Sequence, residues 1–176
     1  MKRFKRPFTL IELMCVIAVI TLLAAISVKV TQVAYRHADE TRTKTILEII
    51  KNANENYKAR NGYYYPNGGS TYNEGGGDFH SIDLNPSNKN DPAAEFLGDA
   101  YETCVKAATD SGGKADKIRD AWGNAIRYRS PGIYNTGTYD LYSIGRDKKV
   151  GDAEDSSRQS PGLGDDLANF KNPKAK

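Results

Sequence analysis

Residues 8–28 read FTLIELMCVIAVITLLAAISV, and this stretch decides how the chain is organised. Glu12 is its only charged residue, and an apolar helix of this length can cross the roughly 30 Å hydrocarbon core of a bilayer. We therefore predict a transmembrane helix over residues 8–30. No Pro or Gly occurs between Phe8 and Asn61, so we expect the helix to continue beyond the membrane.

Basic residues are concentrated ahead of this stretch. The formal net charge is +3, from 25 Lys and Arg against 22 Asp and Glu, and residues 1–7 contain Lys2, Arg3, Lys5 and Arg6. By the positive-inside rule, the N-terminus lies in the cytoplasm and the bulk of the chain on the other side of the membrane. The remainder has no basic stripe suited to nucleic acid. A secretory signal peptide and an uncleaved signal anchor are alternative interpretations of the N-terminus.

Glu12 does not fit a simple anchor. A carboxylate inside an apolar helix costs on the order of 2–3 kcal/mol on insertion scales, so it needs a positive partner. If residues 1–7 were removed, the new amino group of Phe8 would lie at the depth of Glu12. In a staggered stack of helices this amine would pair with Glu12 of a neighbouring copy. The alternative is that the Glu12 side chain reaches back to the lipid headgroups.

Residues 31–61 form the amphipathic second half of the predicted helix. An apolar stripe recurs at helical spacing and consists of Ile46, Ile49, Ile50, Ala53 and Tyr57. Asn61 and Gly62 are a stop signal. We expect the stripe to pack on the rest of the chain and the tyrosines at 63–65 to cover the helix end, with an aromatic surface patch as the alternative.

The remaining residues predict an α+β fold, in which the long helix packs on a small antiparallel sheet with a loop-rich C-terminal region. Residues 62–119 are expected to be variable loops and a short helix: residues 71–90 show no usable period, and 92–108 have one apolar helical face. Residues 120–176 are expected to hold the sheet, with strands over 125–129 and 138–143, and then an acidic loop. Trp122, the only tryptophan, is predicted to anchor the sheet on the helix.

Cysteine and histidine content disfavours several kinds of site. Cys15 lies in the apolar stretch and Cys104 outside it, so we expect no intrachain disulfide and a buried Cys104. The histidines, His37 and His80, do not suggest a metal site. No set of residues typical of nucleophilic catalysis or phosphate binding occurs, so the sequence predicts no enzyme.

The order Phe8, Thr9, Leu10, Ile11, Glu12, Leu13 after a short basic leader resembles the N-terminal signature of type IV pilins and type II secretion pseudopilins. The resemblance implies that a prepilin peptidase cuts between Pro7 and Phe8 and methylates the new amino group. It also implies that Glu12 is the carboxylate that neutralises the Phe8 amine of a neighbouring subunit during assembly. The family almost always has Gly where this chain has Pro7.

A second stretch narrows the resemblance. Residues 120–132, DAWGNAIRYRSPG, and 139–147, YDLYSIGRD, are similar to the C-terminal region of the major pseudopilin of type II secretion, whereas 65–111 has no clear counterpart. This similarity implies a pilin-like subunit of the inner membrane with a periplasmic C-terminal domain. It would polymerise into a helical filament and, with minor pseudopilins and an inner-membrane platform, drive protein export across the outer membrane. The alternatives are a type IV pilin for adhesion, motility or DNA uptake, and a membrane-tethered binding module.

The acidic loop is a candidate calcium site. Carboxylates in a Gly-rich loop suit Ca²⁺, which takes six to eight oxygen ligands, although such loops are often only solvated. The resemblance implies that the ligands are the Ile144 carbonyl and the side chains of Asp147, Asp165 and Asp166. Residues 151–161 are inserted relative to the family pattern, and Glu154 and Asp155 are alternative ligands.

Overall fold

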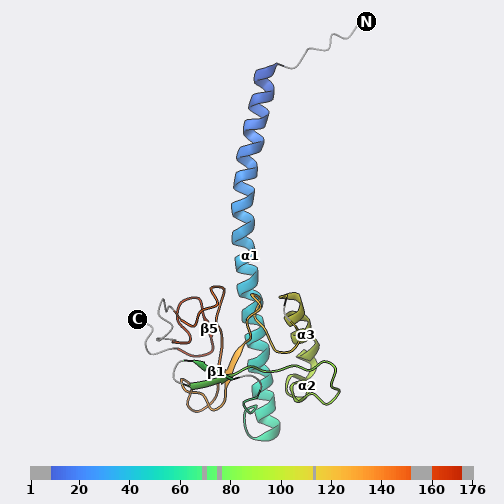
Figure 1. The fold of residues 1–176 in the computed structure, drawn as a ribbon, viewed down its shortest axis with the longest axis vertical. Coiled ribbons are helices and arrows are strands. Elements are labelled where there is room, and N and C mark those ends of the chain that lie inside the picture. Colours follow the sequence, from blue (N-terminus) through green and yellow to red (C-terminus); the bar gives the residue numbers. More distant parts are fainter. Residues whose placement is uncertain (1–8, 69–70, 75–76, 113, 152–159, 172–176) are drawn as a thin grey trace. The chain divides into compact units, whose positions relative to one another are not determined.

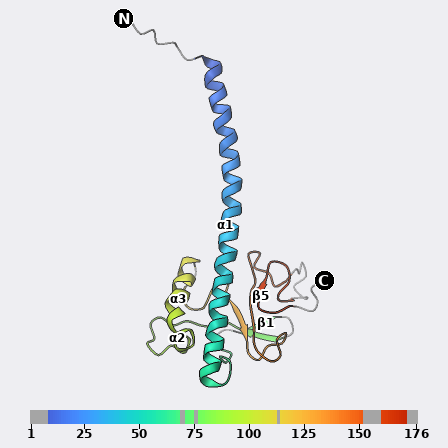
Figure 2. The ribbon, with the colours of Figure 1, turned by 180° about the vertical axis from the view of Figure 1, so that it is seen from behind.

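The structure is a computed structural model that describes residues 9–68, 71–74, 77–112, 114–151 and 160–171, without the side chains of 26–33 and 73–74. The chain divides into two compact units, Met1–Ala38 and Asp39–Lys176. Helix α1, Leu10–Asn61, contributes to both. Within the second unit, α1 lies between the strands on one side and helices α2 and α3 on the other (Figures 1 and 2).

The second half of α1 is the centre of the larger core, as its sequence pattern predicts. Ile46, Ile50 and Ala53 are buried, and Ile49 and Tyr57 pack against them at the edge. The helix ends at Asn61, as expected, because Gly62 takes a positive φ of 82° and its N–H donates to the Lys58 carbonyl at 2.8 Å.

The described strands form one antiparallel sheet in the order β1-β2-β3-β4-β5. The register pairs Tyr72 with Phe79, His80 with Tyr128, and Tyr128 with Leu141. The sheet confirms the predicted α+β class and strand pair, with shorter strands than expected. The strands are β1 (Thr71–Glu74), β2 (Gly77–His80), β3 (Arg127–Arg129), β4 (Asp140–Ser143) and β5 (Leu167–Ala168).

Two expectations about the middle of the chain are wrong. Residues 71–90 are not all loop, because β1 and β2 form a hairpin whose Phe79 is fully buried against Tyr142 with ring centroids 5.0 Å apart. The predicted helix over 92–108 is interrupted: Gly98, with φ of 56°, ends the first segment. The observed helices are α2 (Pro92–Leu97), the 3-10 turn η1 (Gly98–Ala100) and α3 (Tyr101–Asp110).

Trp122 does not have its predicted role. It is partly exposed and belongs to neither core cluster. Tyr128 joins the sheet to the long helix instead, since its ring is fully buried and its hydroxyl can donate to the Tyr65 carbonyl at 2.7 Å or to Asn54 Oδ1 at 3.1 Å. Cys104 is buried and both cysteines are free, as predicted.

The tyrosines after α1 cover its end, as expected. Tyr65 stacks on Phe96 with ring centroids 4.2 Å apart and meets Tyr57 edge-on at 5.4 Å. Tyr64 lies beneath the Lys58 ammonium, which is 4.3 Å from the ring centroid. These contacts close one edge of the larger core.

Among the residues that the structure describes, no helical stretch is both long enough and apolar enough to cross a membrane. The predicted membrane segment, 8–30, includes residue 8 and the side chains of 26–30, which lie outside the described part of the chain.

Candidate functional site

The first candidate site is the start of α1. Glu12 Oε2 accepts the Thr9 backbone N–H at 2.9 Å and the Thr9 hydroxyl at 2.8 Å, and Thr9 Oγ1 accepts the Glu12 N–H at 3.3 Å. This is a reciprocal capping box, and it holds the carboxylate at the positive end of the helix dipole. Thr9 was missed as a functional residue, although its spacing of three from Glu12 is the signal for this motif.

The capping box leaves Glu12 able to bind a second group. Both hydrogen bonds to its carboxylate use Oε2, and the side chain is exposed. Oε1 therefore remains free to meet a cation from another molecule. Pro7 and Phe8, the predicted processing residues, lie outside the described part of the chain, so the structure does not test the cleavage site.

The described helix around Glu12 exposes apolar side chains on every face. Ten large hydrophobic residues between Leu10 and Leu23 are from 49% to 77% exposed. Exposed apolar surface of this extent requires lipid or other helices to cover it. The start of α1 therefore offers a continuous apolar surface to lipid or to other helices.

The second candidate site is the loop between β4 and β5. Asp165 Oδ2 accepts the N–H groups of Arg146 at 2.8 Å and Asp147 at 3.1 Å. Gly145, with φ of 68°, permits this approach, since a Cβ there would lie 2.5 Å from the Asp165 carbonyl oxygen. The structure thus brings Asp147 and Asp165 together across a sequence gap of eighteen residues.

Asp166 lies in the same loop, and only one of its two carboxylate oxygens accepts hydrogen bonds. Its Oδ2 accepts the N–H groups of Gly151 and Gly162, both at 2.9 Å, while its Oδ1 is buried without a hydrogen-bond partner. Burial, reinforced by the charges of Asp165 and Asp147, raises the pKa of Asp166 to about 7. A divalent cation would supply the partner that this oxygen lacks.

These features fit a hard cation without defining a complete site. No cluster of three or more Asp, Glu, His or Cys side chains with metal-binding geometry occurs among the described residues. Ile144 places its side chain in the smaller core cluster, beside the loop. The alternative ligands Glu154 and Asp155 lie outside the described residues.

A buried carboxylate ties this loop to the turn that precedes β3. Asp120 accepts the N–H groups of Trp122 at 3.0 Å and Asn124 at 2.7 Å, the Asn124 amide at 2.9 Å and the Ser143 hydroxyl at 2.7 Å. The same Asn124 amide donates to the Gly145 carbonyl at 2.8 Å. Burial raises the pKa of Asp120 despite the hydrogen bonds from Ser143 and Asn124.

Comparisons with known proteins relate the chain to type II secretion. The family model described as type II secretion system (T2SS), protein G, matches residues 97–159. The type II secretion system core protein G of Vibrio cholerae serotype O1 is 27% identical over 173 residues, covering 97% of this chain and 96% of that protein. The chain is thus similar to a type II secretion pseudopilin over nearly its whole length. A search of solved structures gave no significant match.

The comparisons bear on two sequence-based expectations about this chain. The alignment with the Vibrio protein runs almost from end to end, so it includes residues 65–111, for which the sequence had suggested no counterpart. Members of this family are structural subunits, which supports the expectation that the chain is not an enzyme.

Proposed function

We propose that this chain is a structural subunit of a type II secretion pseudopilus. The observation that carries the proposal is the nearly end-to-end match to a type II secretion core protein G. The exposed apolar start of α1 supports it, because a subunit that exchanges lipid for neighbouring helices needs such a surface.

In this proposal residues 8–30 hold the subunit in the inner membrane before assembly. The N-terminus is cytoplasmic and the second unit periplasmic, in keeping with the basic residues at 1–7. Prepilin peptidase removes residues 1–7 and methylates Phe8. The subunit then joins a periplasmic filament with other copies of itself, together with minor pseudopilins and the inner-membrane secretion platform.

Glu12 sets the position of each incoming subunit. Its carboxylate is held by Thr9 and keeps Oε1 for the Phe8 amine of a neighbour. An ion pair in an apolar filament core is strongly favoured over either charge alone, since an isolated buried charge costs several kcal/mol. The ion pair between Glu12 and the Phe8 amine of a neighbour therefore both fixes the register of the two helices and neutralises their charges.

Calcium completes the loop between β4 and β5. The residues that would hold it are Asp147, Asp165 and Asp166, with the Ile144 carbonyl, and the unpartnered Oδ1 of Asp166 supports this assignment. A bound cation would offset the negative charges of Asp165 and Asp147, which contribute to the raised pKa of Asp166. The loop would then be fixed against β4, and the periplasmic unit would be stiff enough to pack in a filament.

The substitution Glu12→Ala tests the assembly role. We expect it to abolish filaments seen by electron microscopy of the periplasmic and membrane fractions of lysed cells, and to stop export of the secreted substrate, without reducing the amount of membrane-bound protein. Glu55→Ala is the matched control, because Glu55 is exposed on the same helix. Filaments of normal length from the Glu12→Ala protein would refute the proposed role of Glu12.

The same experiment separates the alternative functions. A membrane-tethered binding module would form no filament with or without the Glu12→Ala substitution, and its ligand binding would be unchanged. A type IV pilin would lose filaments as well, but its loss would impair adhesion, motility or DNA uptake instead of protein export. The similarity to core protein G favours the secretion function over both.

A further inference from the structure

Trp122 lies outside the packed core of its own chain. It is the only tryptophan, it is partly exposed, and it packs in neither core cluster. Its backbone N–H donates to Asp120, but within the described part of the chain its indole N–H has no hydrogen-bond partner. Partly exposed tryptophans with a free donor are typical anchors of protein interfaces.

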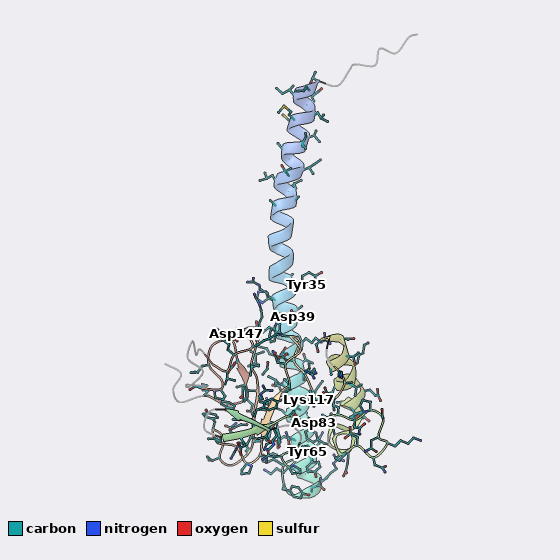
Figure 3. All side chains as sticks on the ribbon, in the orientation of Figure 1. Tyr35, Asp39, Tyr65, Asp83, Lys117 and Asp147 are labelled. Atoms are coloured by element: carbon teal, nitrogen blue, oxygen red, sulfur yellow. The ribbon has the colours of Figure 1, made fainter. Side chains whose placement is uncertain are left out.

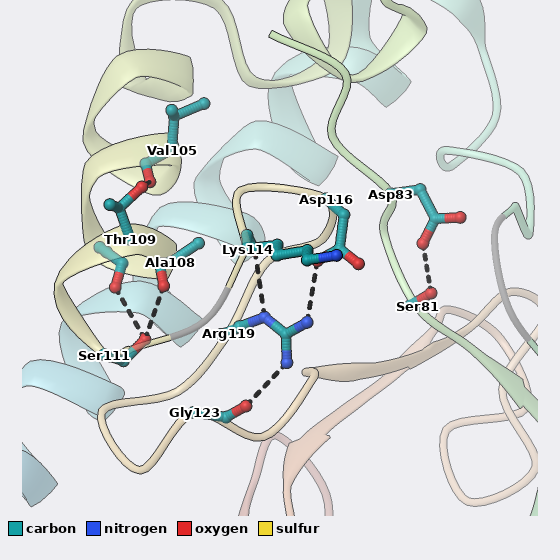
Figure 4. Close-up of polar contacts among 11 residues, drawn as sticks. Ser81, Asp83, Val105, Ala108, Thr109, Ser111, Lys114, Asp116, Arg119 and Gly123 are labelled. Atoms are coloured by element: carbon teal, nitrogen blue, oxygen red, sulfur yellow. Dashed lines mark hydrogen bonds and ion pairs between the residues drawn. The ribbon is translucent and has the colours of Figure 1, made fainter.

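The turn that carries Trp122 is held rigidly. Arg119 braces it from one side, donating to the Gly123 carbonyl at 2.9 Å, to Asp116 at 2.8 Å and to the Lys114 carbonyl at 3.3 Å (Figure 4). The Asp120 carboxylate holds the turn from its inner side by accepting the N–H groups of Trp122 and Asn124. A side chain on such a turn loses little conformational entropy when it docks.

A groove elsewhere on the same unit has the properties of a receptor for an indole ring. It is an open site between the last turns of α1 and the α2–η1 connection and offers about 620 Å³ of space. Its floor is apolar and includes Ala53, Phe96 and Leu97, and its rim carries polar groups from Asn56, Arg60 and Asp99. The Arg60 guanidinium is fixed there by a 3.2 Å hydrogen bond to the Glu95 carbonyl.

The Trp122 turn and the groove lie at opposite ends of the second unit. The turn is tied to α1 at Thr43, whose hydroxyl accepts the Ala121 N–H at 3.1 Å. The groove is centred near Asn56, about 20 Å further along the helix at 1.5 Å per residue. Two labelled residues in Figure 3 show the same separation. Tyr65, which stacks on the groove residue Phe96, lies toward one end of the second unit. Asp147 lies toward the other end, close to Gly145, whose carbonyl accepts the Asn124 amide.

Complementary surfaces at opposite ends of one subunit produce an open helical assembly. A contact between unlike patches is heterologous, and repeating it yields a filament when the rotation does not close into a ring. One chain cannot fill its own groove with Trp122 across about 20 Å of helix. The occupant that the geometry offers is the same side chain of a second copy.

We propose that Trp122 of one subunit inserts into the α1–α2 groove of the next subunit in the filament. The inference rests on the proposed function and specifies a contact within it. The indole would meet the apolar floor, and its N–H would donate to the Asn56 or Asp99 oxygen on the rim.

The single tryptophan makes the contact directly measurable in the unmodified protein. Tryptophan fluorescence of full-length protein is compared between detergent-solubilised monomers and assembled filaments. We expect the filament emission to shift to shorter wavelength and collisional quenching by acrylamide to fall. Filaments with unshifted, fully quenchable emission would overturn the inference while leaving the pseudopilus function intact. Failure of the unmodified protein to form filaments would instead refute the function on which the inference rests.

A groove variant then identifies what covers Trp122. Asn56→Arg places a bulky cation in the groove mouth, and Asn90→Arg places the same residue at an exposed position outside it. The inference predicts that Asn56→Arg abolishes either the filaments or the fluorescence shift, and that Asn90→Arg retains both. Filaments of Asn56→Arg with the unmodified shift would show that another surface covers Trp122, and would refute the groove as its receptor.

Discussion

The substitution Asp120→Ala tests whether one buried carboxylate holds the Trp122 turn, β4 and the acidic loop together. It removes the acceptor of four hydrogen bonds, from two backbone N–H groups, the Asn124 amide and the Ser143 hydroxyl. The backbone groups of the turn are partly exposed and can bind water, and the Asn124 amide keeps its bond to the Gly145 carbonyl. The Ser143 hydroxyl is fully buried, so neither water nor another group replaces the Asp120 oxygen as its hydrogen-bond acceptor.

The expected loss is about 3 kcal/mol of unfolding free energy, from unsatisfied buried groups that cost about 1–3 kcal/mol each and partial rescue by water. For a chain of this size each kcal/mol lowers the melting temperature by roughly 2–4 °C, so a drop of roughly 6–12 °C is expected. Circular dichroism of the full chain in detergent measures it. Asp99→Ala, at an exposed position in η1, is the control and should change the melting temperature little.

The variant Asp120→Asn separates the hydrogen bonds from the charge. It retains one acceptor oxygen for the two backbone N–H groups, and the Ser143 hydroxyl can turn to accept from the new amide. The Asn124 amide loses this acceptor and keeps only the Gly145 carbonyl, so a loss of about 1–2 kcal/mol is expected. Burial raises the pKa of Asp120, so its protonated form favours folding, and that contribution is lost as pH rises through the folded-state value. The unmodified protein should therefore lose stability relative to Asp120→Asn as pH rises. A melting temperature of Asp120→Ala equal to that of the control would refute the reasoning.

The remaining predictions concern the loop, the buried thiol and the leader. Burial raises the pKa of Asp166 to about 7, so in buffer without divalent cations the stability from its protonated form is complete below about pH 4 and is lost as pH rises through 7. A series of thermal melts should show this loss, and Asp166→Asn should remove it; an unchanged slope would contradict the assignment. Calcium at a hundredfold excess over its Kd should add about 2.7 kcal/mol at neutral pH, measured as a rise in melting temperature that EDTA reverses and Asp165→Ala abolishes. Burial raises the pKa of Cys104 to about 11, so mass spectrometry should find the thiol unalkylated at pH 8 until denaturant unfolds the chain. Pro7→Gly should increase the fraction of membrane protein whose intact mass lacks residues 1–7 and carries one added methyl group; equal fractions would show that Pro7 does not limit processing.

The sequence alone determined the features that depend on local pattern. The absence of Pro and Gly up to Asn61, followed by Gly62, defines one helix and its end, and a 3.6-residue period places Ile46, Ile50 and Ala53 in the core. The spacing of Thr9 and Glu12 encodes the capping box, although it was not recognised. These features need no distant partner, because the interacting residues lie within one or two helical turns.

Only the tertiary structure decided the features that depend on distant partners. The hairpin of β1 and β2 has almost no apolar period, and its place in the sheet depends on pairing with β3 and on burial of Phe79 against Tyr142. Asp120 reads in the sequence as an ordinary turn residue, but the fold surrounds it with donors from β4 as well as from its own turn. Trp122 was predicted to anchor the sheet on the helix, yet it is partly exposed, and the buried Tyr128 joins the two instead through a hydroxyl that reaches Asn54 and the Tyr65 carbonyl. Which of several large side chains is buried depends on the polar groups already present in the core, and those groups are brought together only when the chain has folded.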